Sequence, residues 1–290
     1  MENKNKKKTI LLVMLILGIV LVVVGLILNG TKTKDTTSSK DQEKDEDYVK
    51  DDDYNKDINL NSKLIYDKEV KIYIDSVNVS SDNLTIGISI KNTSNQDITI
   101  YNQDIYIDNH LVSGNLFLEV AKGKTEKDEI SVYDPLIRLG NVTTVNTLEI
   151  GFCVEDINGD TLYDIEPIKV SIDDKSNTIN VQGEELYNKD GIVIKYVTNE
   201  TDFISTNFYF YIENNTSKDL LIYSEGVTIN NKNVSSNLNC DIKSGKKNLT
   251  LMMVGDTEYS GEPIESMQLK IFFMDNNEYE IIGNAILNKK

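Results

Sequence analysis

The sequence contains few of the side chains that carry chemistry near neutral pH. Among 290 residues there is one histidine, His110, one arginine, Arg138, no tryptophan, and two cysteines, Cys153 and Cys240. Enzymes take many of their acid-base, nucleophilic and metal-binding groups from this small set of residue types. The composition therefore disfavours an enzyme, and we expect no catalytic residue, no metal site and no cofactor.

Positive charge is also scarce. Lysine and arginine together number 30 against 47 aspartates and glutamates, which gives a formal net charge of -17. A chain this acidic is repelled by phosphate backbones, so nucleic acid is excluded as an expected partner. The length suits about two domains.

One long apolar run stands near the start of the sequence. It extends from Ile10 to Leu28 and follows several lysines. A helix of this length is about 29 Å long, close to the thickness of a bilayer's hydrocarbon core. A cleaved signal peptide has an apolar core of only ~7 to 15 residues and a small-residue cleavage site, so we favour a retained membrane helix over that alternative.

The lysines that precede this run set the expected orientation. Residues 1–9 form a cytoplasmic stub, residues 10–28 a single membrane span, and everything after them lies outside the cell membrane. Residues 29–61 are polar and mainly acidic, which predicts a disordered linker. The acidic stretch from Asp51 to Asp57 lacks the ligand order of a calcium loop, and we interpret it as a solvated charge run.

The chain repeats itself at an offset of 122 residues. The stretch "IKNTSNQDITIY", Ile90 to Tyr101, returns as "IENNTSKDLLIY" at Ile212 to Tyr223. Farther on, the register is expected to drift by about one residue, so that "LEIGFCVED" at Leu148 corresponds to the stretch that begins at Leu269. The interpretation is two copies of one domain, residues 62–175 and 183–290, joined by a short polar linker at 176–182.

Strands rather than helices are predicted within each copy. Leu84, Ile86, Ile88 and Ile90 alternate with other residues, the pattern of a strand with one buried face. Turn signals separate such runs, and the only helical turn expected lies at 134–140. The predicted fold class is all-β, with two tandem antiparallel immunoglobulin-like β-sandwiches.

Several recurring or isolated residues are candidates for functional sites. The repeated turn positions are interpreted as structural, because asparagine and glycine suit turns; they are Asn92, Asn214, Gly123 and Gly245. His110 falls in a predicted hairpin, "IDNHLV", and is expected to be a solvated side chain rather than a metal ligand.

The two cysteines occupy different positions in the two copies. The alternation around Cys240 turns this side chain toward the core, whereas Cys153 points away from the buried face and is the more exposed thiol. This arrangement does not favour a disulfide between them.

The strand, turn and hairpin pattern at Asn92, Asp97, Asn109 and Gly123, repeated at offset 122, resembles a known group. It is similar to the Ig-like domains of unknown function in extracytoplasmic proteins and lipoproteins of Gram-positive bacteria. The resemblance implies a telokin-like sandwich on the secreted side and brings no catalytic residues. Many relatives carry a lipid on a cysteine, whereas this sequence has a membrane helix in its place.

The sequence thus favours a membrane-anchored cell-surface protein with an adhesion, scaffolding or ligand-recognition function. Its partner would be an extracellular protein, a wall polymer or a small ligand. One alternative is an extracytoplasmic sensor or an accessory subunit of a membrane complex. A surface hydrolase is a third reading, but it would require a convergent acid-base pocket.

Overall fold

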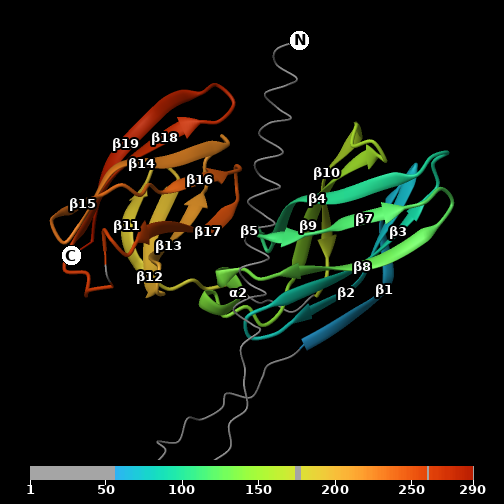
Figure 1. The fold of residues 1–290 in the computed structure, drawn as a ribbon, viewed down its shortest axis with the longest axis horizontal. Coiled ribbons are helices and arrows are strands. Elements are labelled where there is room, and N and C mark those ends of the chain that lie inside the picture. Colours follow the sequence, from blue (N-terminus) through green and yellow to red (C-terminus); the bar gives the residue numbers. More distant parts are fainter. Residues whose placement is uncertain (1–55, 174–177, 260, 290) are drawn as a thin grey trace, which may run out of the picture. The chain divides into compact units, whose positions relative to one another are not determined.

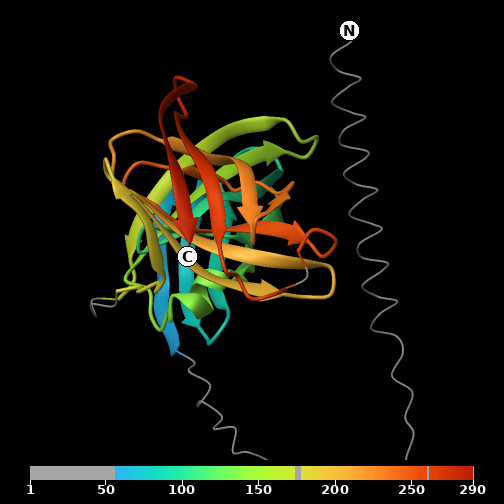
Figure 2. The same cartoon turned by 90° about the vertical axis from the view of Figure 1, so that its left-hand side faces the viewer.

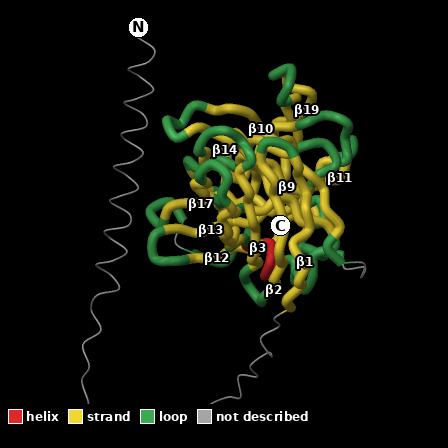
Figure 3. The backbone as a smooth tube through the Cα atoms, turned by 90° about the vertical axis from the view of Figure 1, so that its right-hand side faces the viewer, coloured by secondary structure: helices red, strands yellow, loops and turns green. Residues whose placement is uncertain are grey.

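The computed structural model describes residues 56–173, 178–259 and 261–289. These ranges are built of strands with one short helix, α2 (Pro135–Leu139) (Figures 1 and 3). The all-β prediction is confirmed, as is the helical turn expected at 134–140. The predicted membrane helix, Ile10 to Leu28, and most of the predicted linker lie outside the described residues. Within the described residues, no helix has the length and apolar character needed to cross a membrane.

The first repeat comprises ten strands in two sheets (Figure 1). One sheet has the order β1-β2-β3-β8-β6, and in the other β4 lies between β9, which pairs with β10, and the short strands β5 and β7. The strands are β1 (Lys56–Asp67), β2 (Val70–Val79), β3 (Leu84–Asn92), β4 (Ile98–Ile107), β5 (His110–Val112), β6 (Gly114–Asn115), β7 (Phe117–Val120), β8 (Thr125–Val132), β9 (Thr147–Asp156) and β10 (Thr161–Ser171).

The second repeat has the same strand connectivity, except that β6 has no counterpart in it. Strands β11, β12, β13 and β17 form one sheet, and β14 pairs with β18, β15 and β16 in the other. The last two strands run antiparallel side by side and are drawn in red in Figure 2. The strands are β11 (Glu184–Lys189), β12 (Ile192–Thr201), β13 (Ser205–Asn214), β14 (Leu220–Ile229), β15 (Lys232–Val234), β16 (Asn239–Ile242), β17 (Lys247–Gly255), β18 (Met267–Asp275) and β19 (Glu280–Lys289).

The first strand begins earlier than the sequence predicted. The disordered linker was expected to reach residue 61, but β1 already pairs with β2 from Lys56, which lies opposite Val79. The prediction was wrong for residues 56–61. The acidic composition of this segment gave no sign of a strand. An edge strand needs few buried side chains of its own, and Leu60 is only partly buried against the first core.

Each repeat has its own apolar core. The alternating side chains of β3, including Ile86 and Ile90, are buried in the first core, and those of β13, including Phe208 and Ile212, in the second. The predicted alternation is therefore correct at these strands. Ile179 and Val181, in the segment expected to be a polar linker, are also buried against the first core.

A buried asparagine joins the two sheets of each repeat. Asn92 ends β3 with no exposed surface, and its amide nitrogen donates to the carbonyl of Gln96 at 2.7 Å and to that of Val120, on the facing sheet, at 2.9 Å. Its amide oxygen accepts from the backbone nitrogen of Ser94 at 2.9 Å. The side chain thus holds the turn and the facing strand together.

Asn214 makes the same set of contacts in the second repeat. Its amide nitrogen donates to Lys218 and Ile242 carbonyls at 2.8 and 3.1 Å, and its oxygen accepts from the Thr216 nitrogen at 3.1 Å. The two copies, which the sequence repeat predicted to be equivalent, therefore share individual hydrogen bonds as well.

The repeated glycines form hydrogen bonds with these two asparagines. The nitrogen of Gly123 donates to the Asn92 carbonyl at 3.0 Å, and that of Gly245 to the Asn214 carbonyl at 2.8 Å. Both glycines have positive φ, 73° and 71°, and open space where a Cβ would lie. Backbone conformation rather than crowding therefore explains glycine at both positions.

The register of the two copies shifts more than the sequence suggested. Leu148 lies opposite Ile107, and Met267 lies opposite Ile229, the residue equivalent to Ile107. Leu148 therefore corresponds to Met267 at an offset of 119, and its predicted match with Leu269 is wrong. The reason is that the second repeat crosses between its sheets with three fewer residues and without a counterpart of α2.

The two repeats share one sheet. Strand β5 of the first repeat pairs in parallel with β17 of the second, with His110 opposite Lys247 and Leu111 opposite Asn248. A nine-stranded sheet results, which contains strands of both repeats. Tyr209 and Tyr211 of the second repeat are buried within the first core.

We predict that Asn92→Ala lowers the free energy of unfolding by roughly 2 to 4 kcal/mol, because it leaves buried backbone groups without partners. The measurement is urea unfolding of the detergent-solubilised full chain, followed by circular dichroism. Asn95→Ala, in the same turn but exposed, is the matched control. Equal destabilisation by the two substitutions would contradict a role of the Asn92 hydrogen bonds in holding the two sheets together.

Candidate functional site

A hollow on the outer face of β14 is the candidate binding site of the second repeat. In β14, Leu220 and Ile222 point into the core, so the alternation turns Leu221 and Tyr223 outward. Strand β16 lies on one side, with Asn239 opposite Tyr223, and β18 on the other, with Met274 opposite Leu221. The face is therefore assembled from three strands.

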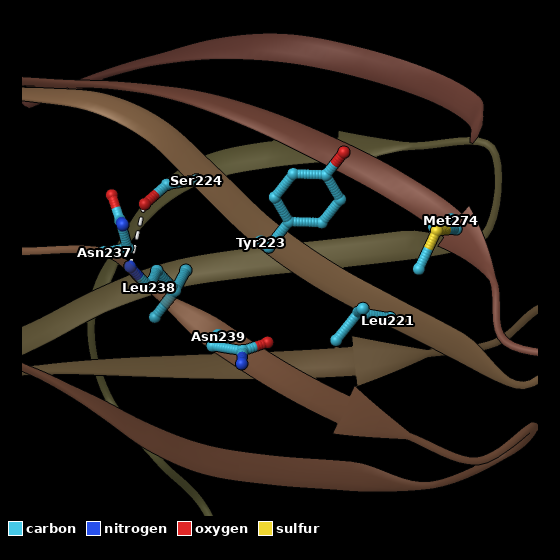
Figure 4. Close-up of a pocket in the computed structure, with 7 residues that line it drawn as sticks. All are labelled: Leu221, Tyr223, Ser224, Asn237, Leu238, Asn239 and Met274. Atoms are coloured by element: carbon cyan, nitrogen blue, oxygen red, sulfur yellow. Dashed lines mark hydrogen bonds between the residues drawn. The ribbon is translucent and has the colours of Figure 1, made fainter. Parts of the chain in front are cut away.

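The hollow encloses about 370 Å³ (Figure 4). Leu238, whose side chain is buried, and Ser224 form its floor, where the Ser224 hydroxyl accepts the backbone hydrogen bond of Leu238 at 2.8 Å. The full lining is Leu221, Tyr223, Ser224, Asn237, Leu238, Asn239 and Met274.

The ring of Tyr223 is held in place from one side. It stacks on Phe272 of β18, with ring centroids 5.2 Å apart and an angle of 15° between the ring planes. The ammonium of Lys270 lies 4.6 Å from the centre of the Phe272 ring, a cation–π contact. These contacts restrict the rotamers of Tyr223, so less entropy is lost when a ligand packs against it.

The side chains that line the hollow are of the kinds that bind a ligand. Leucine, methionine and tyrosine provide apolar contact, and the amides of Asn237 and Asn239 provide hydrogen-bond donors and acceptors. None of the seven lining residues is a His, Cys, Asp, Glu or Lys. Sequence reasoning missed this site, although outward apolar residues at 221 and 223 in an alternating strand were its available signal.

His110 is buried at the junction of the two repeats, so the prediction of a solvated side chain is wrong. Only 3% of its surface is exposed. Nδ1 lies 2.9 Å from the Asp108 carbonyl and Nε2 lies 2.9 Å from the Tyr211 hydroxyl. Since a carbonyl only accepts, Nδ1 carries the proton, and Nε2 accepts from Tyr211. The hairpin carries β5, which pairs with β17 of the second repeat.

Charged side chains surround this junction. Lys246 forms an ion pair with Glu149 at 2.6 Å, and both side chains are largely buried. The Lys246 ammonium also lies 4.4 Å from the centre of the Tyr106 ring. Farther out, Lys243 pairs with Asp104 at 2.8 Å. These charged groups join the two repeats.

The two cysteines are free and lie as the alternation indicated. Cys153 is partly exposed and Cys240 is buried. Burial raises the pKa of Cys240 to about 12, although Asn248 donates a hydrogen bond to its sulfur at 3.3 Å. Burial also raises the pKa of Cys153, and the Asp164 carboxylate adds to this rise. Both thiols are therefore protonated near neutral pH and are weak nucleophiles.

The other predicted site residues divide into two groups. Asn92, Asn214, Gly123 and Gly245 lie in the two turns described above, each at the end of a strand pair within its own repeat. Ile10 and Leu28, the ends of the predicted anchor, lie outside the described residues. In the described ranges, no group of three or more His, Cys, Asp or Glu side chains is placed to hold a metal ion.

No family model matches the chain, and no curated protein does either. Among solved structures, a conserved domain protein from Bacillus anthracis is similar at 14% identity, over 81% of this chain and 89% of that one, with a TM-score of 0.27. A protein of unknown function from Porphyromonas gingivalis W83 is similar at 11% identity, over 81% and 98% of the two chains, with a TM-score of 0.21. Scores this low carry no argument about function.

We predict that the two thiols differ in accessibility. In the native full chain, a maleimide reagent at pH 8 modifies Cys153 and leaves Cys240 unmodified, because Cys240 is buried and its pKa is raised. In denaturant both react. Peptide mass spectrometry of the modified chain provides the measurement, and rapid native labelling of Cys240 would contradict its buried position.

We also predict a pH-dependent stability between about pH 5.5 and 7.5. Burial and the nearby Lys247 ammonium lower the pKa of His110 below its ordinary value. The unfolded chain therefore takes up a proton near pH 6.5 while the folded chain does not, and stability falls as the pH drops below that value.

The measurement is the urea midpoint of the solubilised full chain across this pH range. Since His110 is the sole histidine of the sequence, His110→Gln should flatten the slope, whatever its effect on stability at pH 7.5. An unchanged slope in this variant would assign the pH dependence to carboxylates.

Proposed function

We propose that this chain is a membrane-anchored cell-surface protein whose two repeats are immunoglobulin-like sandwiches that recognise a partner without catalysing a reaction. The apolar run from Ile10 to Leu28 is the single-pass anchor, with the N-terminus in the cytoplasm. The acidic residues that follow it connect the anchor to the repeats. The shared connectivity of the two repeats and their paired sheets support the sandwich assignment.

The observation that carries the recognition function is the hollow beside Tyr223. An apolar depression on the outer face of a sheet, lined with an aromatic ring and amide side chains, provides the contacts that ligand sites use. Tyrosine at such a position is typical of binding hot spots. We propose that the partner inserts an apolar group against Tyr223 and Met274 and exchanges hydrogen bonds with the asparagine amides.

The first repeat does not form the same hollow. Its equivalent of Tyr223 is Tyr101, which packs edge-on against Phe117 at a centroid distance of 5.3 Å. Opposite Tyr101 on the neighbouring strand lies Cys153, where the second repeat has Phe272. Recognition is therefore proposed for the second repeat alone, and the first repeat supplies a matched control.

We predict that Tyr223→Ser lowers the yield of a surface partner at least about tenfold, because it removes the ring against which the partner packs. The full chain is expressed in cells, surface molecules are cross-linked to it on intact cells, and the products are identified after solubilisation. Tyr101→Ser should leave the yield unchanged. An equal loss in both variants, or in neither, would overturn the assignment of the hollow.

The same preparation tests location. Protease added to intact cells should remove the described repeats and leave a membrane-bound fragment. Protection of the repeats would overturn the outward orientation. If a membrane protein is the sole product that depends on Tyr223, the sensor or accessory-subunit alternative replaces the recognition of a wall polymer, soluble protein or small ligand.

A further inference from the structure

The last strand of the second repeat leaves an unprotected sheet edge. Strand β19 pairs with β18 on one side and ends the sheet order β15-β14-β18-β19 (Figure 1). Its sequence, "EIIGNAILNK", has no proline and no charge between Glu280 and Lys289. Ile281, Ile282 and Ile286 are 50%, 45% and 61% exposed. A long, apolar edge of this kind is a template for pairing with another strand.

The equivalent edge of the first repeat is protected. Strand β10, "TLYDIEPIKVS", carries Asp164, Glu166 and Lys169 along its length. Pro167 lies within a register shift between Ile165 and Ile168, and its nitrogen cannot donate to a neighbouring strand. Charges and proline are among the usual means by which an edge strand is kept from pairing. Strand β19 shares with β10 only a register shift, at Ile282, and lacks the proline and the internal charges. Two edges at the same place in one fold therefore differ in the property that controls association.

The neighbouring edge in the second repeat is also charged. Strand β11 ends the other sheet, and it contains Glu184, Glu185 and Lys189. Of these two edges of the second repeat, β19 is therefore the apolar one. Phe272 and Met274 lie beside it on β18, opposite Asn284 and Ile281, so the exposed apolar surface continues inward from the edge.

We propose that β19 pairs antiparallel with β19 of a second copy of this chain across a two-fold axis. The direction follows from charge: the two ends of the strand have opposite sign, so antiparallel pairing brings each Glu280 near the Lys289 of the other copy, whereas parallel pairing aligns like charges. Lys289 is held at its end of the edge by Glu184 of its own copy, 3.5 Å away. Identical strands related by a two-fold axis form a closed pair rather than a filament.

This contact is independent of the proposed recognition function. The hollow beside Tyr223 is built on β14, β16 and Met274 of β18, whereas the pairing edge is the outer side of β19, which lies on the opposite side of β18 from β14. Loss of one contact should leave the other intact. Failure of either proposal can therefore be distinguished from failure of the other.

The first test measures the mass of the full chain in detergent by light scattering across a range of concentrations. The expected result is a reversible dimer, and Ile286→Lys should raise its dissociation constant at least about tenfold, because a charge at an exposed edge opposes pairing. Leu162→Lys, on the protected edge β10 and 40% exposed in the wild type, is the matched control and should leave the dimer unchanged.

A monomer at all concentrations would overturn the proposal. So would a dimer that persists in Ile286→Lys, since it would place the contact elsewhere, for example in the apolar N-terminal run. An equal increase of the dissociation constant in Leu162→Lys would also overturn the proposal, because the effect would then not be specific to β19.

A second measurement does not depend on the stability of the lysine variants. In a chain with Cys153→Ser, Asn284→Cys places an exposed thiol near the middle of β19. A short bis-maleimide should join two copies in high yield, because residues opposite each other across paired strands lie about 5 Å apart. The same change at Leu162 should give no covalent dimer. Equal yields from the two positions would contradict pairing at β19.

Discussion

A buried asparagine amide is the interaction on which each repeat depends. From the end of β3, Asn92 reaches the facing sheet at Val120 and the turn at Gln96, and Asn214 does the same at Ile242 and Lys218. An amide has both donors and an acceptor, so one side chain can satisfy several backbone groups that are shielded from water. Leucine at this position would fill the space but would leave those groups unpaired. This explains why the asparagine recurs while many core residues around it differ.

The junction of the repeats depends on residues that the two copies do not share. Tyr209, Tyr211 and Leu249 of the second repeat are buried against the first. At an offset of 122, the corresponding residues of the first repeat are Gly87, Ser89 and Lys127. The small and charged side chains cannot form the same apolar contact, so a further copy of the repeat would find no equivalent surface there. The contact between the repeats therefore depends on side chains that only the second repeat has at these positions.

The same divergence distinguishes the two outer surfaces. The second repeat exposes Tyr223 stacked on Phe272 and an apolar edge at β19, whereas the first has Cys153 opposite Tyr101 and a proline in β10. The first repeat thus has a protected edge at β10, whereas the second has the apolar edge and the hollow for which we propose association.

The sequence by itself determined the features that arise from local physics. Period-two alternation predicted the buried faces of β3 and β13, and positive-φ turns required glycine at 123 and 245. The repeat itself was visible at an offset of 122, and the helical turn at 134–140 was foreseen from its composition. The orientation of Cys240 toward the core also followed from alternation.

Tertiary structure alone decided what depends on contacts between distant segments. The burial of His110 required Tyr211, 101 residues away, and no local pattern distinguishes a covered hairpin from an exposed one. The sequence offset of 119 between β9 and β18 depends on the length of the segment that crosses between the two sheets. The alternation of apolar residues does not predict this length. The first strand from Lys56 was hidden because an edge strand is held by backbone hydrogen bonds to β2, and these do not depend on side-chain identity. Local periodicity fixes which face of a strand is apolar, but the partner that covers it is selected by three-dimensional packing.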